Sequence, residues 1–82
     1  MEATSELIDE LRPRAFAIAY RMLGSVSEAE DVVQEALLRV HQALQRGEVI
    51  SSPRAYIATV VTRLAIDELR SARMRRETYV GE

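Results

Sequence analysis

The chain has 82 residues, of which 48% are hydrophobic and only 5% aromatic, so we expect a single domain whose core consists of Leu, Val, Ile and Ala. It contains no cysteine, which excludes disulfides and thiolate metal sites and favours a reducing cytoplasm as the compartment. No apolar run approaches the roughly 18 residues of a membrane span, and no signal peptide is recognisable, so no membrane association is expected.

The net charge of −2 hides an uneven distribution. Residues 1–53 carry nine carboxylates and five arginines, whereas residues 54–76 carry six arginines against Asp67 and Glu68. All eleven cations are arginines, which suit planar contacts with phosphates and bases, although a GC-rich genome would explain the same bias. The chain therefore has an acidic half and a basic half.

Helix signals recur along the chain and predict an all-α fold, a compact bundle of about four helices. The predicted helices span residues 5–11, 13–23, 27–46 and 53–76. Pro13 lacks an amide hydrogen and suits the first turn of a helix, so we expect it to separate the first helix from the second. Gly24 is a natural stop after the second helix. No alternating run of useful length predicts a strand.

The two long helices have clear boundary signals. Ser27 and Glu30 form a capping box at the start of the third predicted helix, and Gly47 ends it. After a short loop, Ser52 caps the last helix and Pro53 occupies its first turn. Each long helix has one apolar stripe, so the faces opposite these stripes are the candidate functional surfaces.

The face opposite the apolar stripe of the third predicted helix carries Asp31, Gln34, Glu35, Leu38 and Gln42. A solvated polar face explains this pattern, because single exposed apolar residues are common and carboxylates in a first turn complement the helix dipole. The alternative is a docking surface, in which Leu38 is an apolar anchor and the surrounding carboxylates and amides suit a basic helical partner.

The corresponding face of the last predicted helix is basic. It carries Tyr56, Thr59, Arg63, Asp67 and Arg70, and the charge continues at Arg73, Arg75 and Arg76. Aromatic, hydroxyl and guanidinium groups in one row suit stacking on the bases and contacts with the phosphates of a single-stranded nucleic acid. Arginines near a helix C-terminus also simply complement the dipole, and Asp67 can form an ion pair with an arginine one turn away.

Nothing in the sequence predicts catalysis, a metal site or a cofactor. His41 is the only histidine, and no cysteine can join it in a metal site or a triad. No glycine-rich phosphate loop is present. Adjacent carboxylates such as Glu30 and Asp31 are expected to be exposed, so they do not form a general acid–base pair. We therefore predict that the protein is not an enzyme.

Two motifs carry a family resemblance: AEDVVQE at residues 29–35 and RLAIDELR at residues 63–70. With AYRMLGSVSE before the first motif and PRAYIATVVT between them, the stretch from about Leu11 to Gly81 closely resembles region 2 of the extracytoplasmic-function (ECF) sigma factors of bacterial RNA polymerase. This resemblance implies one non-catalytic domain over residues 1–82. The sequence RRETYVG, at residues 75–81, resembles that of the subgroup whose full-length members carry an additional C-terminal SnoaL-like domain.

The resemblance implies a docking role for the acidic face. In the family, the helix with the DxxQE pattern binds the clamp helices of the polymerase β′ subunit. Carried over to this chain, the polymerase-binding residues are Asp31, Gln34, Glu35, Leu38 and Arg39. His41 stands where many relatives have tryptophan, which weakens the expected packing or docking at that end of the helix.

For the basic face, the resemblance implies binding to the non-template single strand of the promoter minus-ten element, with one base flipped out of the duplex. The DNA-binding residues are then the loop 47–52 and Arg54, Tyr56, Thr59, Arg63, Arg70 and Arg73. Tyr56 stands where many relatives have tryptophan, so it stacks over less area. Stacking on one aromatic side chain stabilises binding by roughly 1–3 kcal/mol and unpairing costs a few kcal/mol, so the polymerase must supply the rest.

The chain also departs from the family pattern. ECF sigma factors normally continue to a second helical domain that reads the minus-thirty-five element, and these residues contain none. An excised domain and a truncated relative that competes for polymerase both fit this departure. An anti-sigma factor or the protein's own C-terminal domain are further partners that the resemblance allows. The alternative function is a protein-only interaction module that occupies polymerase or an anti-sigma factor without touching DNA.

Overall fold

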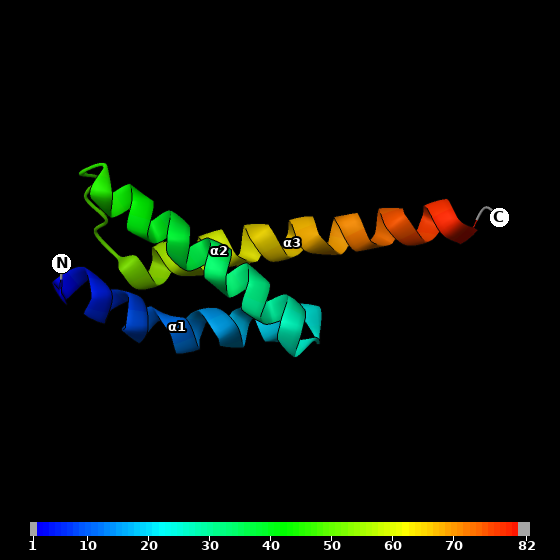
Figure 1. Ribbon diagram of the computed structural model, residues 1–82, viewed down its shortest axis with the longest axis horizontal. Helices are drawn as coiled ribbons and strands as arrows, with labels where there is room; N and C mark the ends of the chain where they lie inside the picture. Colours follow the sequence, from blue (N-terminus) through cyan, green and yellow to red (C-terminus); the bar gives the residue numbers. More distant parts are fainter. Residues whose placement is uncertain (1, 81–82) are drawn as a thin grey trace.

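The computed structural model describes residues 2–80, and the side chains of residues 4–75. These residues form three α-helices and no strand: α1, Glu2–Leu23; α2, Val26–Gln45; and α3, Pro53–Val80. Each helix packs against the other two. The first half of α3 lies beside α1 and α2, and its second half extends beyond them (Figure 1).

The prediction of about four helices is wrong, because the segments predicted at 5–11 and 13–23 form one helix that continues through Pro13. Proline cannot donate the hydrogen bond that residue 13 would make to the carbonyl of Asp9, which costs about 3 kcal/mol inside a helix. Here Pro13 is exposed, so water can hydrate that carbonyl. Leu11 and Ala15, on either side of it, are buried, and this uninterrupted apolar face holds the helix together.

The predicted start of the long middle helix is also corrected. The cap is Ser25, not Ser27: its backbone is extended (φ −132°, ψ 128°) and its side chain accepts a hydrogen bond from the Glu28 amide at 3.3 Å. Both serines precede a glutamate by three residues and fit the capping pattern. Gly24 explains why Ser25 is the cap. Its amide donates the last hydrogen bond of α1, to Tyr20 O at 2.8 Å, and the chain turns there, so that α2 begins immediately after Ser25.

The helix boundaries on either side of the loop agree with the sequence, whereas α1 begins at Glu2 rather than at residue 5 and α3 continues to Val80 rather than ending near residue 76. Ser52 Oγ accepts a hydrogen bond from the Ala55 amide at 3.3 Å, and Pro53 is the first residue of α3. At the end of α2, Gly47 N donates to Leu44 O and Glu48 N donates to Ala43 O, the pair of bonds that closes a helix at a left-handed glycine.

The core consists of Leu, Val, Ile and Ala, as the composition predicts. Ile57, Val40 and Val61 are the largest fully buried side chains. Six alanines are completely buried between the helices: Ala15, Ala19, Ala29, Ala36, Ala43 and Ala65. No polar or charged side chain is buried within the described residues. The polar chemistry of the domain therefore lies on its surface.

Gly47 has φ +86°, in the left-handed region, and an added Cβ would meet no atom within 4 Å. The strain of an L-residue there, about 1–2 kcal/mol, is therefore the main cost of a substitution. We expect Gly47→Ala to lower the free energy of unfolding by about 1 kcal/mol in urea denaturation. Gly47→Asn is expected to cost less, because asparagine tolerates this conformation. An unchanged midpoint for Gly47→Ala would contradict the prediction.

Candidate functional site

The outer face of α2 presents every residue predicted for docking. Asp31, Gln34, Glu35, Leu38 and Arg39 are all exposed, while the opposite side of the helix is buried. Leu38 is 47% exposed although its side chain is large and apolar. Glu35 and Arg39 form an ion pair one turn apart, with Arg39 Nε donating to Glu35 Oε2 at 3.1 Å. This face therefore offers an apolar contact with fixed charge beside it.

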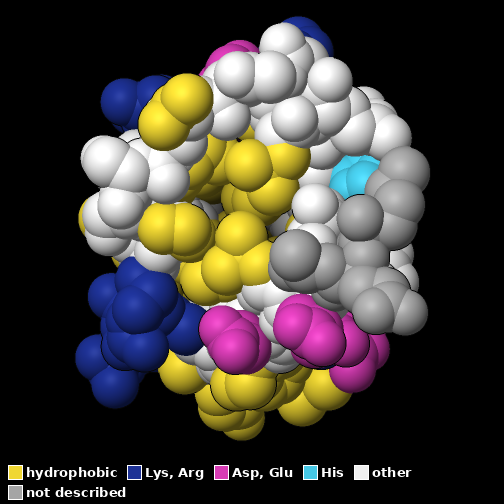
Figure 2. All heavy atoms as spheres, turned by 90° about the vertical axis from the view of Figure 1, so that its left-hand side faces the viewer, with side chains coloured by type: hydrophobic (Ala, Val, Ile, Leu, Met, Phe, Trp, Pro, Cys, Tyr) yellow, Lys and Arg dark blue, Asp and Glu magenta, His cyan; other side chains and the backbone are white. Residues whose placement is uncertain are grey.

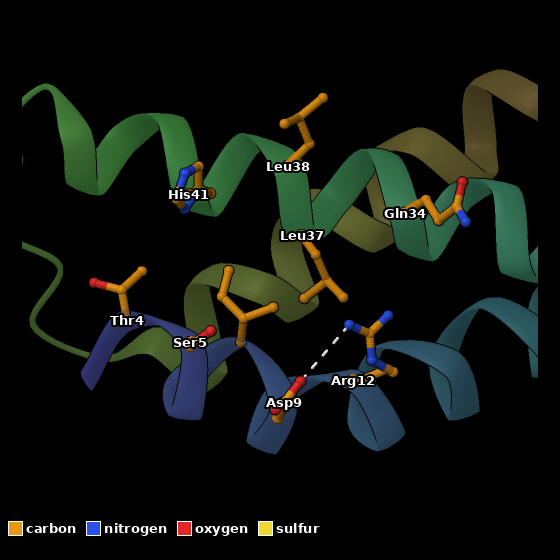
Figure 3. A pocket seen from close by; sticks show the side chains of 9 residues that line it. Thr4, Ser5, Asp9, Arg12, Gln34, Leu37, Leu38 and His41 are labelled. Atoms are coloured by element: carbon orange, nitrogen blue, oxygen red, sulfur yellow. Dashed lines mark ion pairs between the residues drawn. The ribbon is translucent and has the colours of Figure 1, made fainter. Parts of the chain in front are cut away.

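A groove of about 580 Å³ runs between this face and the first half of α1 (Figure 3). It is lined by Thr4, Ser5, Ile8, Asp9, Arg12, Gln34, Leu37, Leu38 and His41. Leu37 reaches into the space between the helices, whereas Leu38 points away from it. The ion pair of Arg12 with Asp9, 3.8 Å apart, lies on the α1 wall. Half-buried His41 lies at one end of the groove.

A smaller hollow, of about 240 Å³, lies between α2 and α3. It is lined by Val32, Leu64 and Ser71 and by four carboxylates from the two helices: Asp31, Glu35, Asp67 and Glu68. Glu68 is paired with Arg75 at 3.8 Å. The ion pairs expected between Asp67 and neighbouring arginines do not occur among the described residues. Asp67 instead extends the acidic face of α2 onto α3.

A third hollow joins the loop after α2 to the first half of α3. It measures about 440 Å³ and is lined by Glu48, Val49, Ile50, Ser51, Ser52, Ala55, Tyr56, Thr59, Val60 and Arg63. Tyr56 packs partly against the core, and Val49 is 94% exposed. Figure 2 views the end of the molecule where the loop lies and shows apolar side chains gathered in the middle of it.

Two ion contacts from one arginine hold the loop at the rim of this hollow. Arg46 donates to Glu48 Oε2 through Nη2 at 2.7 Å and through Nε at 3.1 Å. Glu48 therefore faces the hollow with its charge largely compensated. Arg54, Arg70 and Arg73, also predicted for this surface, do not line it; they lie elsewhere on α3 and are exposed.

Nine of the eleven arginines fall into two groups. Four of them pair with carboxylates: Arg12, Arg39, Arg46 and Arg75. Among the side chains of residues 4–75, no carboxylate pairs with Arg14, Arg21, Arg54, Arg63 or Arg70. All five lie on α1 or α3 and are exposed. Their charge is thus available to an external anion, and the acidic face of α2 does not neutralise it.

The part of the chain that the structure describes lacks two further features. It contains no helix that is both long and apolar enough to cross a membrane. It also contains no group of three His, Asp or Glu side chains that could hold a metal ion.

Residues 7–75, which make up α1, α2 and most of α3, match the family described as sigma-70 region 2. The chain belongs to this family. Its region 2 fold is the three-helix arrangement of Figure 1, and the two motifs lie on α2 and α3, on either side of the loop.

Three similar proteins are longer than this region 2 domain. It is 51% identical over 73 residues to the ECF RNA polymerase sigma factor SigJ of Mycobacterium tuberculosis, covering 89% of this chain and 22% of SigJ. It is 43% identical over 70 residues to SigL of the same species and 30% identical over 69 residues to SigW of Bacillus subtilis. These matches cover 84% of this chain, and 40% and 37% of those relatives. The chain thus spans less than half the length of these relatives. No solved structure is significantly similar to it.

The sequence of the region 2 domain did not predict how its helices meet. The spacing of apolar residues indicated which residues of α2 and α3 face outward, but not that α1 would form the second wall of the groove beside Leu38. It also gave no sign that Asp67 would join Asp31 in one hollow. Both features depend on contacts between residues far apart in the chain.

Proposed function

We propose that this region 2 domain docks on bacterial RNA polymerase and holds the opened non-template strand of a promoter minus-ten element, without catalysing a reaction. The observation that carries the proposal is the family match over residues 7–75, on a fold that keeps the two surfaces on different helices. The acidic docking face belongs to α2, and the hollow and the uncompensated arginines belong to the loop, α3 and α1. One domain can therefore contact both partners at once.

The docking part of the proposal assigns the outer face of α2 to the clamp helices of the β′ subunit. An apolar anchor inside a polar ring is the common anatomy of a protein interface, and Leu38 with Gln34 and Glu35 has this form. Carboxylates beside the anchor favour a basic partner and increase the rate of encounter. The polymerase contacts are Asp31, Gln34, Glu35, Leu38 and Arg39.

The DNA part of the proposal assigns the hollow beside Tyr56 to a flipped base, and Arg63 with the other exposed arginines of α3 to the phosphates. A volume of about 440 Å³ lies within the roughly 300–1,000 Å³ that is usual for ligand pockets. Tyr56 supplies a ring for stacking, and Arg63 supplies a charge that no described carboxylate neutralises. The proposed DNA contacts are Arg54, Tyr56, Thr59, Arg63, Arg70 and Arg73.

Tyr56→Ala is expected to weaken binding to a minus-ten single strand by about 5- to 150-fold, because stacking on one aromatic side chain is worth roughly 1–3 kcal/mol. The measurement is a fluorescence-anisotropy titration of a labelled strand in the presence of core polymerase. Tyr56→Phe is the matched control: it keeps the ring and its packing against the core, and it should bind like the wild type.

The same titration separates the two candidate functions. Binding that depends on the sequence of the strand supports the proposal. A domain that binds polymerase but shows no sequence-dependent binding of the strand would be the protein-only module instead. A Tyr56→Phe variant that loses as much affinity as Tyr56→Ala would mean that the hydroxyl, not the ring, carries the contact.

Three finer points belong to the proposal. The cytoplasm is the compartment in which a domain of this function works. An anti-sigma factor or a C-terminal domain of the same protein is a regulatory partner. The assignment to the subgroup with a SnoaL-like domain is based on the sequence RRETYVG at residues 75–81. The side chains after Arg75 lie outside the described residues. The reading frame that encodes the chain tests this last point.

A further inference from the structure

An arginine of α1 reaches across to the first turn of α3. Arg14 Nε donates a hydrogen bond to Arg54 O at 3.4 Å, between residues 40 positions apart in the chain. Both arginines are exposed. Figure 1 shows α1 and α3 running side by side from the same end of the molecule, so this contact lies at the seam between the two helices.

The charge at this seam is not neutralised by any carboxylate that the structure describes. Glu10 lies four positions before Arg14, at a spacing that commonly forms an ion pair on a helix. The Arg14 side chain contacts α3 instead, and no described carboxylate pairs with Arg14 or Arg54. Figure 2, which views this end of the molecule, shows arginine side chains gathered next to exposed apolar ones, with carboxylate side chains beside them.

We propose that Arg14 adds α1 to the DNA-binding surface, with its guanidinium contacting a backbone phosphate next to the phosphate held by Arg54. This inference rests on the proposed function, because Arg54 belongs to the proposed DNA contacts. Arginine binds phosphate oxygens through charge-assisted hydrogen bonds, and neighbouring phosphates of one strand would bind the two arginines. The surface therefore extends across the seam from α3 to α1.

Arg21 continues the same row on α1. It lies seven residues after Arg14, which returns a helix to nearly the same side about 10.5 Å further along its axis. It is exposed, and no described carboxylate pairs with it. A row of unpaired arginines suits a polymer of regularly spaced phosphates, whereas the paired arginines of the domain lie beside carboxylates that already neutralise them.

The experiment measures how salt weakens binding of the 82-residue chain to labelled oligonucleotides, starting at low salt. Each phosphate contact contributes about 0.7 to the slope of log affinity against log salt for a single strand, and about 0.9 for duplex DNA. Arg14→Ala is expected to reduce the slope for the single strand by about 0.7. Arg12→Ala is the matched control, because it removes the same charge two residues away, where Arg12 is already paired with Asp9.

The outcomes of this experiment distinguish a failure of the inference from a failure of the proposed function on which it rests. A slope that falls with Arg63→Ala but not with Arg14→Ala overturns the inference and leaves the proposed function standing. Binding with no salt dependence in the wild type overturns both. A reduction seen with duplex DNA alone supports the phosphate contact and assigns it to the duplex beside the opened strand.

Arg14→Lys keeps the charge and should retain the wild-type slope; a slope as low as that of Arg14→Ala would count against a phosphate contact. An equal reduction with Arg12→Ala also overturns the inference, because it would then reflect net charge alone.

Discussion

Ile57→Ala is expected to lower the free energy of unfolding by about 2–5 kcal/mol, the usual cost of deleting most of a fully buried aliphatic side chain. Ile57 is 0% exposed and belongs to the cluster that joins α3 to the buried faces of α1 and α2. Small domains have total stabilities of roughly 5–15 kcal/mol, and a chain of 82 residues lies near the lower end of the size range for independent folding. The variant should therefore unfold at a much lower urea concentration.

The measurement is urea denaturation followed by far-ultraviolet circular dichroism, with the slope of the transition unchanged and its midpoint shifted. Val49→Ala is the matched control, because Val49 is 94% exposed and surface changes usually alter stability by less than about 0.5 kcal/mol. Ile57→Val should fall between the two, at about 0.5–1.5 kcal/mol. A loss below 1 kcal/mol for Ile57→Ala would mean that α3 is not held by this side chain.

The helix boundaries that the sequence predicted correctly depend on local signals. A left-handed glycine after an apolar stripe and a serine before a proline act within a few residues, so they can be read without knowing the neighbouring helices. The prediction that Pro13 separates two helices is wrong for the opposite reason. Its missing hydrogen bond is a local penalty, whereas the burial of Leu11 and Ala15 against the other helices is a tertiary gain that only the structure reveals.

The candidate site also combines features that the sequence predicts with features that it does not. Which residues face outward on α2 follows from helical periodicity, and the exposure of Gln34 and Leu38 agrees with it. What lies across from each face does not follow from periodicity. The contact of Arg14 with Arg54 spans 40 positions, and no spacing rule relates them. Family resemblance supplied roles for single residues but not this contact between helices.

Gln34→Ala combined with Glu35→Ala is expected to weaken binding to a fragment of the β′ clamp helices by roughly 30-fold or more. Truncating one interface hot spot costs about 2 kcal/mol or more, and each 1.4 kcal/mol is a factor of ten. Both side chains are exposed, so the fold should not change. The ion pair of Glu35 with Arg39 lies on the surface, where such pairs contribute about 0–1 kcal/mol to stability.

Isothermal titration calorimetry measures the affinity, and circular dichroism checks that the double variant is folded. Glu28→Ala combined with Gln45→Ala is the matched control, because it removes one carboxylate and one amide from the two ends of α2, on the side of Glu35 and Leu38 but about two turns away from them. Its affinity should stay close to that of the wild type. A folded Gln34→Ala/Glu35→Ala variant that binds the fragment as tightly as the wild type would rule out this face as the docking surface. Leu38→Ala then separates the contributions, since a loss there alone would show that the apolar anchor, rather than the polar ring, provides the affinity.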